Sequence, residues 1–90
     1  MKILEVNINS LDEIKNEIVS NVGKTIVIQE FNKQGKQIHE YTGEIMDTYA
    51  SLFLVKVSTN NFFINRSFSY ADFITRDRSY EILEKTLNLD

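Results

Sequence analysis

Hydrophobic and polar positions alternate over residues 3–8, where an apolar side chain stands at every second place. A two-residue period is typical of a β-strand. An extended segment here would be an edge strand, which offers unpaired backbone groups to another chain. Two alternatives follow for this segment: it pairs within its own sheet, or it forms the strand pairing of a homodimer.

The pattern then changes to the period of an α-helix. Ser10 and Glu13 have the spacing of a capping box, in which each side chain accepts a bond from the other residue's amide. The apolar residues that recur on one face are Leu11, Ile14, Ile18 and Val22. Gly23 is suited to ending the helix in a left-handed conformation. The spacing predicts a helix over about 11–21.

From residue 24 onward the pattern indicates short strands. The predicted strands cover residues 25–28, 38–47, 53–57, 62–68, 73–75 and 80–83, with polar turns at 32–36, 49–51 and 59–61. Gly43 interrupts the longest strand, which usually marks a bulge or a tight bend. Ser69 is placed to cap a single helical turn over 69–72, by accepting a hydrogen bond from the amide of Asp72 or nearby.

Short strands, one bent strand and a helical turn before the last strands indicate a small, strongly bent barrel. We predict a mainly β fold, an SH3-like or Sm-like barrel of about five strands preceded by one N-terminal α-helix. The 90 residues are the length of a single domain, 1–90. The N-terminal segment and helix occupy about 1–22, the barrel about 24–83, and a short tail 84–90.

Composition narrows the classes of function. The chain has no cysteine, which excludes disulfides, thiolate metal sites and cysteine nucleophiles. It has no apolar run of about 18 residues, so we expect no membrane span. Its N-terminus lacks the apolar core of a secretory signal, so we expect a cytoplasmic protein. The formal net charge is −3, and the acidity lies near the two ends, which argues against a dedicated nucleic-acid binder.

The residues suited to catalysis do not form a recognisable constellation. His39 stands beside Glu40 near a predicted hairpin, without the further ligands of a metal site or the partner that orients a general base. Glu44 and Asp47 are three positions apart, so on a regular strand they would point to opposite faces. We interpret these four residues, His39, Glu40, Glu44 and Asp47, as solvated side chains. We predict no enzyme activity, no metal and no cofactor.

The aromatic residues Phe62, Phe63, Phe68, Tyr70 and Tyr80 are needed mainly for the core of so small a barrel. A platform for stacking nucleobases and a protein-binding patch are the alternatives.

Arg66 shares the strand parity of Ile64 and Phe68, so a regular strand would point it inward. An unpaired buried arginine is costly, which leaves a bulge, an open strand edge, or a carboxylate partner such as Asp72 or Glu44. Tyr70 and Asp72 form either a capped turn or a recognition corner. The candidate contact residues are Tyr49, Lys56, Arg66, Tyr70, Asp72, Arg76 and Arg78.

Several segments resemble the Veg family of low-GC Gram-positive bacteria, over about two-thirds of the chain from Gly23 to Ile82. The matching pieces are Ile14-Lys15, Gly23-Lys24, Gly43, Thr48-Tyr49-x-Ser51-x-Phe53 and, most specifically, Ser67-Phe68-Ser69-Tyr70-Ala71-Asp72-Phe73-Ile74-Thr75. The resemblance implies an Sm/SH3-like barrel behind an N-terminal helix. It also implies stimulation of biofilm formation through the control of matrix-gene expression, by opposing a repressor. It carries over no catalytic residues.

This sequence departs from the family pattern at three places. Ala50 stands where the family usually has proline, and the first hairpin is less basic. Asn65 takes a usually basic position, and Arg66 a usually apolar one. A role that needs a basic surface would be weaker here. The leading hypothesis is therefore a regulatory protein that binds another protein. The alternative is a barrel that binds single-stranded DNA or RNA through Lys56, Arg66, Arg76, Arg78 and exposed tyrosines, with an affinity that falls steeply with salt.

Overall fold

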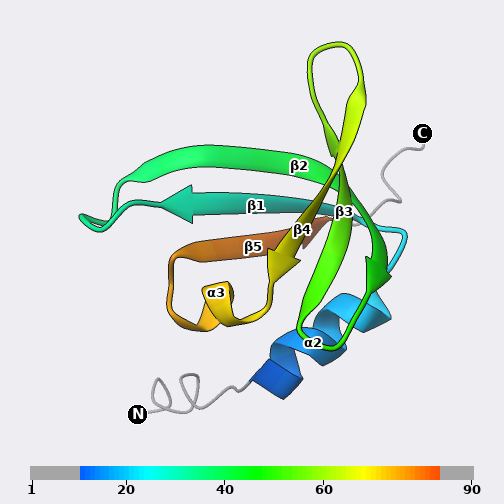
Figure 1. The fold of residues 1–90 in the computed structure, drawn as a ribbon, viewed down its shortest axis with the longest axis horizontal. Coiled ribbons are helices and arrows are strands. Elements are labelled where there is room, and N and C mark those ends of the chain that lie inside the picture. Colours follow the sequence, from blue (N-terminus) through cyan, green and yellow to red (C-terminus); the bar gives the residue numbers. More distant parts are fainter. Residues whose placement is uncertain (1–10, 84–90) are drawn as a thin grey trace.

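In the computed structural model, which describes residues 11–83, one antiparallel sheet of five strands is accompanied by two helices (Figure 1). The elements are α2 (Leu11–Ser20), β1 (Thr25–Phe31), β2 (Gln37–Thr48), β3 (Leu52–Ser58), β4 (Phe63–Ser69), α3 (Ala71–Ile74) and β5 (Arg78–Leu83). The strand order is β4-β3-β2-β1-β5. The predicted strand over 3–8, the Ser10 cap and the tail 84–90 lie outside the described residues.

The sheet is strongly bent but does not close into a ring. β4 and β5 are its two edges and do not pair with each other. Nevertheless, the Arg78 guanidinium of β5 lies 5.0 Å from the ring centroid of Phe68 on β4. The Tyr41 ring on β2 lies 5.5 Å from the same Phe68 ring, across the intervening β3. The predicted mainly β fold with a bent sheet and an N-terminal helix is confirmed, as an open rather than a closed structure.

The core lies on the inner, concave face of this sheet. Alternate strand residues supply it, as the period of a half-buried strand requires. The buried side chains are Ile26, Ile28, Ile45, Phe53, Val55, Val57 and Phe68 from the strands, with Ile18 from α2 and Tyr70 before α3. Of the predicted apolar face of the helix, Ile18 is buried and Ile14 packs against the core, whereas Leu11 and Val22 are exposed.

Helix α2 is fixed to the sheet at several points. It ends at Ser20, one residue earlier than predicted, and Gly23 follows with a φ of 95°. The Gly23 amide donates to the Ile45 carbonyl at 2.8 Å. The Tyr80 hydroxyl of β5 donates to the Glu17 carboxylate. Burial, and to a lesser extent that carboxylate, raises the pKa of Tyr80.

Gly43 marks a close approach of two strands. It is paired with Ile26 on β1 and with Val57 on β3. A Cβ at this position would lie 2.3 Å from the Lys56 carbonyl oxygen, closer than real side chains approach. The irregularity in the β2–β3 pairing falls between Ile45 and Asp47, so the bulge is not at Gly43 itself.

This bulge corrects the expectation for the two carboxylates of β2. Glu44 is opposite Lys56, and Asp47 is opposite Leu54, which is two residues from Lys56 on β3. Glu44 and Asp47 therefore face the same side of the sheet, and the prediction of opposite faces is wrong. The extra residue, Met46, shifts the alternation by one position. Both carboxylates are exposed, as expected for solvated positions.

The predicted strand over 73–75 is also wrong, because Ala71–Ile74 form the short helix α3. The Phe73 amide donates to the Tyr70 carbonyl, and the Thr75 amide to the Ala71 carbonyl. This helical spacing brings the Phe73 ring to 5.9 Å from Phe53, so apolar burial favours the helix. The Ser69 hydroxyl accepts from the Ala71 amide at 3.2 Å, one residue before Asp72.

Candidate interaction surface

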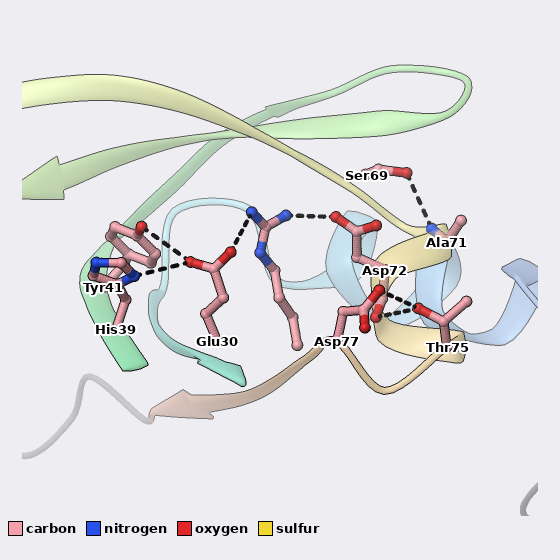
Figure 2. A network of polar contacts seen from close by, with 9 residues as sticks. Glu30, His39, Tyr41, Ser69, Ala71, Asp72, Thr75 and Asp77 are labelled. Carbon is pink, nitrogen blue, oxygen red and sulfur yellow. Dashed lines mark hydrogen bonds and ion pairs between the residues drawn. The ribbon is translucent and has the colours of Figure 1, made fainter. Parts of the chain in front are cut away.

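A row of polar side chains crosses the inner face of the sheet at one end (Figure 2). Ile26, Ile28 and Glu30 share a parity on β1, so Glu30 points to the same face as the two buried isoleucines. Glu30 is paired in register with Arg78 on β5 and with His39 on β2. The pairing register of β2, β1 and β5 therefore places His39, Glu30 and Arg78 side by side.

Arg78 bridges two carboxylates. One guanidinium nitrogen donates to Asp72 Oδ2 at 2.5 Å, and the other to Glu30 Oε2 at 3.2 Å. The Arg78 side chain is only 16% exposed and stacks on Phe68. Two predicted contact residues, Arg78 and Asp72, are thus bonded to each other, and Arg78 links β5 to β1 and α3.

The second oxygen of Glu30 faces His39 and Tyr41. Glu30 Oε1 accepts from the Tyr41 hydroxyl at 3.3 Å and lies 3.3 Å from His39 Nδ1. The His39 and Tyr41 rings stack with centroids 6.0 Å apart. Within residues 11–83, no group of three or more histidine and carboxylate side chains is placed to hold a metal ion.

Arg66 points to the concave face, as its parity predicted. The pairing of β4 with β3 has no register shift, so no bulge re-aims it. Its guanidinium lies 4.8 Å from the Tyr41 ring centroid and 5.7 Å from that of Phe68. A carboxylate partner such as Asp72 or Glu44 was one of the alternatives, but Asp72 is bonded to Arg78 and no carboxylate among residues 11–83 forms an ion pair with Arg66. Of the three alternatives, the structure shows the open strand edge.

The hairpin between β3 and β4 projects beyond the rest of the sheet (Figure 1). Its apolar side chains Phe62, Phe63 and Ile64 are 61%, 60% and 40% exposed. Lys56 Nζ lies 4.8 Å from the Phe63 ring centroid, so a cation covers part of this aromatic surface. We call residues 59–64 the hairpin tip.

The aromatic residues therefore divide into two groups. Phe68 and Tyr70 are buried, and Tyr80 packs against the core, as expected from the core interpretation. Phe62 and Phe63 remain outside the core. Their position directly after the predicted turn over 59–61 was the available signal, because connecting segments and the residues beside them lie at the surface.

The remaining candidate residues lie apart from the hairpin. Tyr49 is exposed near the β2–β3 turn, where its hydroxyl donates to Asp47 Oδ2 at 3.2 Å, and this bond is the main cause that raises its pKa. Arg76 has a φ of 72° and lines a groove of about 850 Å³ with Lys33 and Phe73, among others. The structure thus brings Lys56 and Arg66 onto one hairpin and leaves Tyr49 and Arg76 elsewhere.

Tyr70 is 2% exposed, and its buried hydroxyl has no hydrogen-bond partner among residues 11–83. Burial raises the pKa of this phenol. We expect Tyr70→Phe to leave the free energy of unfolding unchanged or to raise it by up to about 1 kcal/mol, because the substitution removes an unsatisfied buried group. Urea unfolding followed by circular dichroism would measure the change. A loss of more than about 1 kcal/mol would show that the hydroxyl has a partner in solution.

Comparison with known proteins gives a family match for this chain. The family model described as "Biofilm formation stimulator VEG" matches residues 9–80, which includes α2 and most of the sheet. A search of the curated proteins finds no match. No helix within the described part of the chain is long and apolar enough to cross a membrane.

Proposed function

Because this chain belongs to the Veg family of biofilm formation stimulators, we propose that it acts as a non-enzymatic regulatory protein that binds another protein. The proposed partner is a transcriptional repressor of biofilm matrix genes, which the binding would oppose. The hairpin tip is the proposed contact surface.

The observation that carries this proposal is the exposure of Phe62 and Phe63. Adjacent exposed aromatic side chains on a projecting hairpin are costly to keep in water, and such patches mark interaction sites. Buried aromatic anchors supply much of the binding energy of protein interfaces. Lys56 beside Phe63 adds a charge that a partner can pair with at the rim.

The distribution of cations supports a protein partner over nucleic acid. Arg78 is paired with two carboxylates, and Arg66 is stacked on aromatic rings on the concave face. Arg76 lies on another loop, after α3. A groove that follows a nucleic-acid backbone needs a continuous series of available cations.

We expect the double substitution Phe62→Ser/Phe63→Ser to weaken partner binding at least about tenfold, because hot-spot aromatic anchors each contribute about 2 kcal/mol or more. The measurement is capture of the partner by tagged protein from nuclease-treated host lysate. Titration with the purified partner follows. The matched control is Val19→Ser/Val22→Ser, which removes exposed apolar side chains at and just after the end of α2, away from the hairpin.

Three results would contradict the proposal. One is a partner bound equally well by the hairpin variant and the wild type. Another is the absence of any nuclease-resistant protein partner. The third is a partner lost on nuclease treatment, which would favour nucleic acid. Thermal unfolding of both variants checks that each remains folded.

A further inference from the structure

We propose that β4 binds an extended acidic segment of the partner protein as an added strand, with a carboxylate of that segment on the Arg66 guanidinium. This inference rests on the proposed function and names the chemistry of the partner. It follows from the free edge of β4, from the exposure of its first half and from the uncompensated charge of Arg66.

The hydrogen bonds at the two ends of the β3–β4 hairpin identify the free backbone groups. The Thr59 amide donates to the Phe62 carbonyl at one end, and the Tyr70 amide donates to the Ser51 carbonyl at the other. In an antiparallel ladder, hydrogen-bonded residue pairs alternate with non-hydrogen-bonded pairs. Counting from either end of the hairpin gives the same set of hydrogen-bonded pairs between β3 and β4. The residues of β4 whose N–H and C=O groups point away from β3 are then Phe63, Asn65, Ser67 and Ser69.

The first half of this edge is accessible among the described residues. Within 11–83, β4 is an edge strand, and β5 does not pair with it. Residues 63–65 and Ser67 are exposed, whereas Phe68 is buried beneath the aromatic cluster. Natural edge strands are usually protected by lysine, proline, a bulge or an inward-pointing charge. Within β4 there is no lysine, no proline and no register shift, and its inward-pointing charge is Arg66. An added strand therefore has to supply a carboxylate for Arg66, whereas an apolar strand would leave this charge unpaired.

Arg66 supplies the specificity for an acidic segment. Its guanidinium is oriented by the Tyr41 and Phe68 rings, and within residues 11–83 it has no ion pair. Arg78, the other arginine stacked on Phe68, has two carboxylate partners. Tyr41 belongs to β2, so the guanidinium leans away from the free edge of β4 in this structure. A strand added to β4 places alternate side chains on the concave face, and the long arginine side chain would turn toward a carboxylate there. Such a carboxylate would form charge-assisted bonds with the guanidinium fork.

The β4 strand of a second copy does not supply that carboxylate. Arg66 is the only charged residue of β4, so pairing two β4 strands would bring two cations together and no anion. The charge therefore favours a different protein, whose segment carries Asp or Glu, over self-association through this edge.

The test is selection of twelve-residue peptides from a random displayed library on the full-length protein. The selected sequences should be enriched in Asp or Glu between β-branched or aromatic residues. The affinity of a labelled selected peptide should fall at least about tenfold in Arg66→Gln, in line with the loss of charge-assisted bonds. Arg66→Lys should bind with intermediate affinity, since lysine keeps the charge without the planar fork.

Asn65→Pro tests the strand geometry, because it removes an outward N–H without removing a bond to β3. It should also weaken the peptide at least about tenfold. Arg76→Gln is the matched control, because it removes the same charge from another loop, and it should bind as the wild type does. Thermal unfolding of each variant confirms that the fold is retained.

Selected peptides without acidic enrichment, or acidic peptides that bind Arg66→Gln as tightly as the wild type, would overturn the inference. Sedimentation that showed a dimer abolished by Asn65→Pro would overturn it in favour of a second copy. If the protein partner is lost with Phe62→Ser/Phe63→Ser but retained by both Arg66→Gln and Asn65→Pro, the inference fails while the proposed function stands. If acidic peptides bind β4 but no lysate partner exists, the proposed function fails instead.

Discussion

Gly43→Ala is expected to lower the free energy of unfolding by about 3 kcal/mol or more, because the new Cβ meets backbone atoms that cannot turn aside. The nearest atoms are the Lys56 carbonyl oxygen at 2.3 Å and the Lys56 carbonyl carbon at 2.8 Å. Relief would require β2 and β3 to separate at the point where β2 is paired on both sides. Urea unfolding of both proteins would measure the loss.

Gly35→Ala is the matched control for this substitution. Gly35 has a φ of 84°, and nothing lies within 4 Å of a Cβ built there. Its substitution therefore adds only the strain of a left-handed residue, about 1–2 kcal/mol. A loss for Gly43→Ala no larger than that for Gly35→Ala would show that the strands do not approach closely at this position.

Arg78→Met is expected to lower the free energy of unfolding by about 2–3 kcal/mol. Removing one partner of a buried ion pair costs about 3–5 kcal/mol, and partial solvent access to Glu30 and Asp72 reduces this value. Methionine keeps much of the apolar stem but leaves both carboxylates without their cation. Arg78→Lys should recover only part of the loss, because an ammonium lacks the fork that reaches two carboxylates.

A multiple-mutant cycle separates the ion pairs from packing. In the Arg78→Met background, adding Glu30→Gln and Asp72→Asn removes the stranded charges and should restore part of the stability. If Arg78→Met lowers the free energy of unfolding equally with and without Glu30→Gln and Asp72→Asn, packing of the arginine stem against Phe68 accounts for the loss.

The sequence predicted those elements that depend on local pattern. The apolar spacing around Ile18 located α2 to within one residue at its C-terminal end. The polar turns at 32–36, 49–51 and 59–61 separated strands that the structure contains, although β1 extends further than predicted, to Phe31. These features follow from side-chain periodicity and turn chemistry, which neighbouring residues determine.

The features that escaped prediction depend on tertiary packing. Phe73 has high β-propensity, yet the cluster around Phe53 draws it into a helical turn. The bulge at Met46 reverses the expected relation of Glu44 and Asp47, and the local signal for a bulge was Gly43, three residues earlier.

The polar row at the end of the sheet shows the same limit. Arg78 was predicted as a contact residue, but its partner Glu30 is remote in sequence, and only the pairing of β1 with β5 brings them together. Conversely, the parity of Arg66 correctly predicted its inward direction. The aromatic rings that accommodate its charge come from Tyr41 on β2 and Phe68 on the same strand. The inward direction of the Arg66 side chain follows from its position along β4. Its contact with the Tyr41 ring depends on how the sheet bends, which the local sequence does not specify.

The position of β5 beside β1 also determines the order in which the molecule can form. The four strands from β1 to β4 pair with their neighbours in sequence, whereas Glu30 on β1 and Arg78 on β5 are 48 residues apart. Loop-closure entropy makes such a long-range contact slow to form. During synthesis, β1 can pair with β2 early, but its second edge stays unpaired until β5 has been made, after β2, β3 and β4. The nascent chain therefore exposes one backbone edge of β1 while β2, β3 and β4 are made, and β5 with Arg78 ends that exposure.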